Sequence, residues 1–101
     1  MRIEKVNGFW VPTIDVHLND WKAGKPFTQN KCLNKFLEYC KTQNHKFKLV
    51  LDIGAWCGIL ADSMSIHCEK IICFEPDALI FKCLQNNIKS KNIKCENIAL
   101  G

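Results

Sequence analysis

The chain has 101 residues, a formal net charge of +4 and 48% hydrophobic residues, which fits one small globular domain and argues against disorder and low complexity. Its apolar runs are far shorter than the roughly 20 residues of a membrane helix, and the segment that begins at Met1 has no apolar signal-peptide core. We therefore expect a cytoplasmic protein with no membrane partner. The lysines are spread along the chain rather than clustered, which disfavours nucleic acid as a partner.

Residues 1–27 are predicted to form an amino-terminal extension. The segment 6–12 is typical of a short strand or hairpin, and a turn-rich stretch follows it. We expect Trp10 and Trp21 to pack this extension onto the domain. The alternative is that Trp21 lines a ligand pocket with its polar neighbours.

The segment 28–42 carries a helical pattern. Its apolar residues recur at i, i+3, i+4 and i+7, and Pro26 with Thr28 provides a start signal. The residues of this stripe are Leu33, Phe36, Leu37 and Cys40. Such a face needs a sheet to cover.

Strand and helix patterns alternate in the rest of the chain. The predicted elements are a strand over 47–53, a helix over 59–66, a strand over 70–74, a helix that begins at Pro76 and Asp77 and has a polar exit over 86–92, and a more polar strand over 93–100. Strands that alternate with helices imply right-handed crossovers and a parallel sheet with helices on its faces. The expected fold class is therefore α/β and Rossmann-like, with about three core strands in residues 28–101.

Seven cysteines are many for this length, and their odd number argues against a disulfide framework. Structural zinc sites usually include two ligands two to four residues apart, and the nearest spacing here is Cys68 to Cys73, with His67 beside it. We expect reduced and mostly buried cysteines and no metal site, with zinc as the less favoured alternative. No cysteine has an evident histidine partner for nucleophilic catalysis.

The first predicted strand ends at Asp52, and a turn with Gly54 and Gly58 follows it. Such a turn is expected to leave backbone N–H groups free at the carboxyl end of the strand, where open α/β sheets bind ligands. The dinucleotide fingerprint requires a glycine where its backbone meets a diphosphate, and Trp56 occupies that place. A diphosphate is therefore disfavoured, and no Gly-Lys-Ser/Thr follows to make a P-loop.

A second acid, Glu75, ends the next predicted strand about 20 residues after Asp52, a separation that suits a ribose diol. A carboxylate can accept hydrogen bonds from both hydroxyls, and Asp52 can meet a positively charged amino group directly or through water. Two acids around a glycine turn suit a cationic nucleoside, and S-adenosylmethionine is the common cofactor of that description. Either acid could instead cap a helix.

Four segments resemble the successive motifs of the FkbM-type S-adenosylmethionine-dependent methyltransferases, a class I group. They are 50–58 (VLDIGAWCG), 74–77 (FEPD), 84–87 (LQNN) and 97–101 (NIALG), and FEPD is the most specific. The resemblance implies a cofactor loop with Asp52, Gly54, Ala55, Trp56 and Gly58, a ribose-binding Glu75, Pro76 flanking the adenine, and residues from Asn97 to Ala99 near it. Family members usually have a small or polar residue at position 56, so Trp56 departs from the pattern.

A complete class I fold has more strands than the three predicted here. The resemblance thus implies an amino-terminal, cofactor-binding half that is inactive alone, with its catalytic residues unknown. The complete enzyme is expected to transfer a methyl group to a small-molecule or glycan hydroxyl. A complementing polypeptide, or self-association through the exposed first strand, is the expected partner.

Two further hypotheses stay open. One is a non-catalytic Rossmann-like module for nucleoside binding or interaction. The other is a nicotinamide or flavin oxidoreductase, which the missing middle glycine disfavours.

Overall fold

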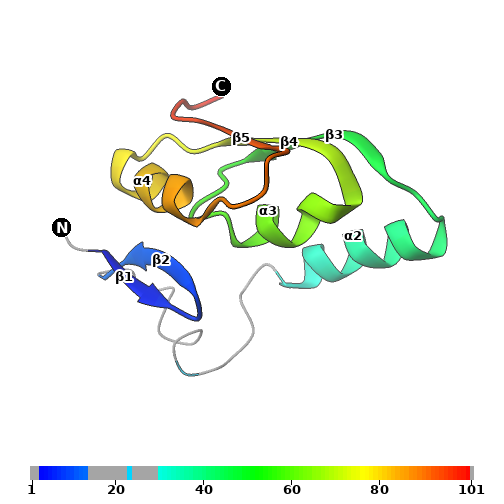
Figure 1. Ribbon diagram of the computed structural model, residues 1–101, viewed down its shortest axis with the longest axis horizontal. Coiled ribbons are helices and arrows are strands. Elements are labelled where there is room, and N and C mark those ends of the chain that lie inside the picture. The colour runs from blue at the N-terminus through cyan, green and yellow to red at the C-terminus, as the bar shows by residue number, and fades with distance from the viewer. Residues whose placement is uncertain (1–2, 14–22, 24–29, 101) are drawn as a thin grey trace.

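A computed structural model describes residues 3–13, 23 and 30–100 (Figure 1). An amino-terminal hairpin pairs β1 (Ile3–Val6) with β2 (Phe9–Pro12) in antiparallel register. Asn7 and Gly8 make the turn with positive φ angles of 50° and 88°, as a two-residue hairpin turn requires. The predicted hairpin is therefore confirmed, while Trp21 lies outside the described residues.

Three parallel strands form the main sheet in the order β3-β4-β5. They are β3 (Phe47–Ile53), β4 (Cys68–Phe74) and β5 (Ile93–Glu96). The prediction of a parallel α/β sheet is confirmed, but the predicted strand over 93–100 is too long. Pairing stops after Glu75 N donates to Glu96 O at 3.1 Å, because Pro76 has no N–H to continue the ladder.

In the described part of the chain, three α-helices connect or precede these strands. They are α2 (Asn30–Thr42), α3 (Ile59–Met64) and α4 (Ala78–Asn87), and a 3-10 turn η1 (Ser65–His67) follows α3. The predicted helix over 59–66 thus ends early, where Ser65 Oγ donates to Asp62 O at 2.8 Å. The start of α4 is fixed by Asp77, whose Oδ1 accepts hydrogen bonds from Leu79 N and Ile80 N at 3.0 Å each.

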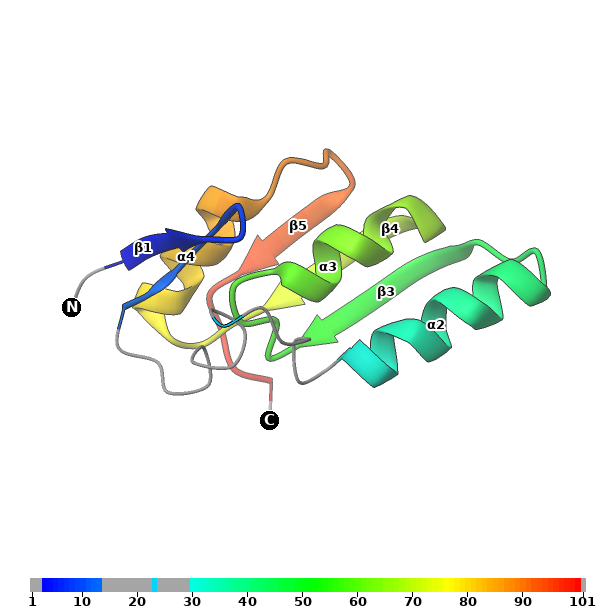
Figure 2. The same ribbon diagram turned by 90° about the horizontal axis from the view of Figure 1, so that it is seen from below.

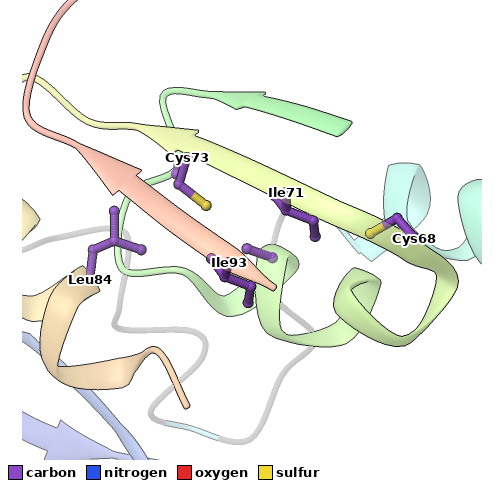
Figure 3. Close-up of a cluster of buried hydrophobic side chains, with 7 residues drawn as sticks. Cys68, Ile71, Cys73, Leu84 and Ile93 are labelled. Carbon is purple, nitrogen blue, oxygen red and sulfur yellow. The ribbon is translucent and has the colours of Figure 1, made fainter. Parts of the chain in front are cut away.

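The three α-helices all lie on one side of the sheet (Figure 1). The core between the two layers is built mainly from β4, α4 and β5, as the close-up in Figure 3 shows for Cys68, Ile71, Cys73, Leu84 and Ile93. Five of the seven cysteines are buried and all seven are free, which agrees with the expected thiols, although Cys32 is exposed. No helix in the described part of the chain is long and apolar enough to cross a membrane.

Among the described residues, helices cover one side of the sheet, and the other side carries exposed apolar side chains. Leu49, Leu51 and Ile53 of β3 are 52%, 51% and 64% exposed. Leu51 and Ile53 lie in register with Ile72 and Phe74 of β4, so the five residues share one surface, here named the open face. Within the described residues β3 pairs only with β4, which confirms the predicted exposed edge strand.

Leu51→Lys should reduce the binding of a hydrophobic dye and any concentration-dependent association. Because Leu51 is already half exposed, the free energy of unfolding should change by less than ~1 kcal/mol. Dye fluorescence, sedimentation velocity and urea denaturation measure these effects. The control is Ile66→Lys, at a residue that is 77% exposed in η1 and outside the sheet, and an equal effect of both variants would contradict the prediction.

Candidate functional site

The carboxyl ends of the parallel strands meet at one end of the sheet, where the loop after β3 and the segment after β5 also lie (Figure 2). A hollow of about 150 Å³ opens there, here named the strand-end hollow. It is lined by Ile53, Gly54, Phe74, Pro76, Ile98, Ala99 and Leu100. Three of the predicted site residues, Gly54, Pro76 and Ala99, are therefore brought together around one largely apolar cavity.

The backbone of the strand-end loop, residues 54–58, is turned back onto the end of β4. Gly54 N and Ala55 N both donate to Phe74 O, at 2.9 and 3.0 Å, and Gly58 N donates to Ala55 O at 3.1 Å. Trp56 N donates to Glu75 Oε1 at 3.0 Å. The expectation of free N–H groups is thus wrong at these four positions, and this loop offers no such cradle for a phosphate.

Glu75 is 7% exposed and holds the loop to the beginning of α4. Its Oε1 accepts from Trp56 N, and its Oε2 accepts from Asp77 N at 3.0 Å. An ionised carboxylate has about four acceptor positions, so two bonds leave capacity for ligand hydroxyls. The ribose-binding role of Glu75 stays a prediction, and its loop-holding role is a second function that the sequence pattern did not reveal.

Asp52 lies on the helix-covered side of β3, the side on which Val50 packs against the core. Its Oδ2 is buried and has no hydrogen-bond partner within the described residues. Burial raises the pKa of the Asp52 carboxyl above its ordinary value, and the negative charge of Glu75 raises it further. An unpaired buried acceptor beside a second acid suits a cationic or hydrogen-bond-donating group.

The segment after β5 is tied to the end of β4 by Asn97. Its Nδ2 donates to Glu75 O at 2.8 Å and to Pro76 O at 3.1 Å. This amide takes the place of the ladder that Pro76 interrupts, and it keeps Ala99 at the strand-end hollow. Asn97 therefore supports the hollow by positioning the segment that lines it.

The other predicted loop residues are directed elsewhere. Ala55 is buried in the main core, and Trp56, at φ 54°, packs against a second cluster beneath the hairpin. Gly58 has φ 85°, and a Cβ there would lie 2.7 Å from Leu84 Cδ1, so α4 requires glycine at this position. Of these three residues, none lines the strand-end hollow, and their cofactor contacts stay predictions.

Asn87 is a buried polar residue that was expected only in the polar exit of a helix. The residue is only 4% exposed, and its side-chain amide forms hydrogen bonds with both the hairpin and the strand-end loop. Asn87 follows Cys83 and Leu84 by four and three residues, so it falls on the apolar stripe of α4. A polar residue on a buried stripe was the signal that could have identified it.

Comparison with known proteins gives structural neighbours only. No family model and no curated protein matches the chain. The YcgJ protein from Bacillus subtilis is similar with a TM-score of 0.53 and 18% identity, over 69% of this chain and 30% of that one. PH1948 from Pyrococcus horikoshii, described as a proposed RNA methyltransferase, gives a TM-score of 0.58 and 22% identity, over 91% of this chain and 45% of that one.

These likenesses concern the fold alone. The chain spans less than half the length of either neighbour. Its three-stranded parallel sheet with helices is a partial Rossmann-like fold.

Asp52→Asn should stabilise the protein near neutral pH. A carboxyl whose pKa is raised by folding contributes its full stability below its ordinary value of 3.8, and that contribution is lost as the pH rises through the raised pKa. The uncharged variant should gain about 1 kcal/mol in unfolding free energy near neutral pH, with the difference vanishing in acid.

Urea denaturation across the acid-to-neutral range measures this difference. Asp62→Asn, on the exposed surface of α3, is the matched control and should change stability by less than ~0.5 kcal/mol. A wild type that is more stable than Asp52→Asn near neutral pH would show that the Asp52 carboxylate is stabilised in its charged form.

Proposed function

We propose that this chain is the cofactor-binding half of an S-adenosylmethionine-dependent methyltransferase. The observation that carries the proposal is a pair of acids at adjoining strand ends, one of them with an unpaired buried oxygen, beside a small apolar hollow. The methyltransferase-like fold supports the same class. The sequence motifs at 50–58 and 74–77 support the FkbM type within it.

The residues present fit the parts of this cofactor. The hollow between Gly54, Pro76 and Ala99 would hold the flat adenine, and the remaining acceptor positions of Glu75 would bind the ribose hydroxyls. The unpaired Oδ2 of Asp52 would meet the cationic amino group. When bound, the cofactor supplies an electrophilic methyl group on a sulfonium; the chain's own residues only bind and orient it.

The acceptor side belongs to the proposal as well. Family resemblance favours transfer to a hydroxyl of a small molecule or glycan, and no residue of this chain is assigned as catalytic. The proposed location is cytoplasmic, without nucleic acid or membrane as a partner.

The open face and the edge of β3, which is unpaired among the described residues, support a partner. Parallel sheets are normally covered on both faces, and this one exposes Leu49, Leu51 and Ile53. Because each structural neighbour is more than twice as long as its matched part, we propose that a further polypeptide with the rest of the fold covers this face. Self-association through the same edge is the alternative.

A non-catalytic binding or interaction module is the second candidate function. It is favoured by the bonds of Glu75, since both carboxylate oxygens already hold backbone N–H groups. On this hypothesis Glu75 is structural, and its loss would leave ligand selection unchanged. A nicotinamide or flavin site is disfavoured because four N–H groups of the strand-end loop are bonded within the protein.

Glu75→Gln should weaken binding of S-adenosylhomocysteine, the demethylated cofactor, at least about tenfold, because hydrogen bonds to a charged group contribute ~1.5 kcal/mol or more. Calorimetry with wild type and variant measures this change. Asp77→Ala is the control, since it removes the α4 cap at a cost of ~1 kcal/mol in stability but should leave affinity unchanged. Tighter binding of NADH than of S-adenosylhomocysteine would refute the proposal.

Residues 1–101 alone should bind the cofactor weakly and transfer no methyl group. Methyl transfer depends on holding acceptor and cofactor at attack distance, and no acceptor pocket is identified in the described residues. A radiolabelled methyl-transfer assay against simple sugars and phenols checks this outcome. Turnover by the purified chain would show that the acceptor site is already present.

A further inference from the structure

The hairpin and the strand-end loop are joined by one buried amide. Asn87 Oδ1 accepts from Trp10 N at 2.6 Å, and Asn87 Nδ2 donates to Trp10 O and to Cys57 O, both at 2.8 Å. The side chain therefore pairs with both backbone groups of a β2 residue, as a neighbouring strand would. Its second amide hydrogen reaches the loop, so both donors of the amide are satisfied.

An apolar contact runs beside this amide. Trp56 of the loop and Trp10 of the hairpin pack against the same buried cluster of Val11, Cys57 and Cys83. Trp56 holds a left-handed backbone conformation, φ 54°, that bulky residues rarely adopt. The hairpin and α4 together therefore hold the loop in a conformation that the loop sequence alone does not favour.

Trp56 and Cys57 of the strand-end loop are held by hydrogen bonds to their backbone groups. Trp56 N donates to Glu75 Oε1, and the next residue, Cys57, accepts from Asn87 through its carbonyl oxygen. One peptide segment is thus fixed from the ligand side by Glu75 and from the hairpin side by Asn87. A shift on either side must be transmitted to the other, or one hydrogen bond must break.

We propose that the hairpin β1–β2 is a clamp on the strand-end loop, and that Asn87 is the positioning residue that couples hairpin docking to ligand binding at Glu75. The ligand part of this inference rests on the proposed function. The clamp explains why the loop carries tryptophan at position 56, which anchors the hairpin. By linkage, a ligand that tightens the Glu75 side must also tighten the hairpin by the same coupling free energy.

The test compares Asn87→Ala with Asn92→Ala. Asn92 is a matched control because its Nδ2 also donates to two backbone oxygens, Ser65 O at 2.8 Å and Cys68 O at 3.1 Å, away from the loop at the start of β4. Both variants should lose stability by similar amounts. Only Asn87→Ala should accelerate amide hydrogen exchange at Trp56 and in β2 without any ligand.

Ligand binding provides the second measurement. S-adenosylhomocysteine should slow exchange in β2 of the wild type and of Asn92→Ala, and Asn87→Ala should lose this response and bind at least severalfold more weakly. If Asn87→Ala does not fold, Asn87→Asp replaces it, because it keeps the size and the acceptor for Trp10 N but loses the donors to Trp10 O and Cys57 O.

The outcomes separate the clamp from the proposed function. Accelerated exchange at Trp56 in Asn87→Ala but not in Asn92→Ala supports the clamp, even if S-adenosylhomocysteine does not bind and the cofactor assignment fails. Unchanged exchange at Trp56 after release of the hairpin overturns the clamp, whatever the ligand affinity. Equal acceleration in both variants also overturns it, because general destabilisation would then be sufficient.

Discussion

The structure depends on how the backbone N–H and C=O groups are hydrogen-bonded where the chain leaves its parallel strands. Buried N–H and C=O groups must find partners, and the turns after β3 and β4 contain the buried residues Ala55, Cys57 and Glu75. Phe74 O accepts two N–H groups from the strand-end loop, and Glu75 accepts two more from Trp56 and Asp77. Asn97 and Asn87 satisfy carbonyl oxygens on either side. A few side chains therefore fix the geometry of the whole strand end.

This pairing decides which ligands the site can accept. A loop that has used its N–H groups internally cannot cradle a diphosphate, which is why the β-α-β unit of this chain differs from a dinucleotide site despite the similar topology. Among the buried side-chain polar atoms of the described residues, the one without a partner is an acceptor, Asp52 Oδ2, and an unpaired buried acceptor suits a donor or a cation. This strand end therefore offers a ligand hydrogen-bond acceptors, which would suit the proposed nucleoside with its hydroxyls and positive charge.

The sequence predicted those features that follow from local periodicity. The apolar run of β3 has the predicted bounds, and Asp77 caps α4 beside the predicted start. Features that depend on distant contacts could not be predicted in this way. Trp56 was predicted to lie in a cofactor loop because its neighbours in sequence match that motif, whereas its side chain packs against a cluster that includes the distant residues Val11 and Cys83. Asn87 was missed because its partners, Trp10 and Cys57, are 77 and 30 residues away.

The open face and the strand-end hollow are parts of one surface. Ile53 and Phe74 belong to the open face and also line the strand-end hollow, and Ile98 and Leu100, which complete the hollow, are 50% and 45% exposed. A half-exposed aliphatic side chain forgoes ~1 kcal/mol of burial, so a layer that covered this face would gain stability from several residues at once. The same layer would enclose the hollow on its open side, while Asp52 stays on the helix-covered side of β3. On the proposed function, a partner that covers the sheet would also close the hollow, and the affinity of the isolated chain would report how much of the site exists without that partner.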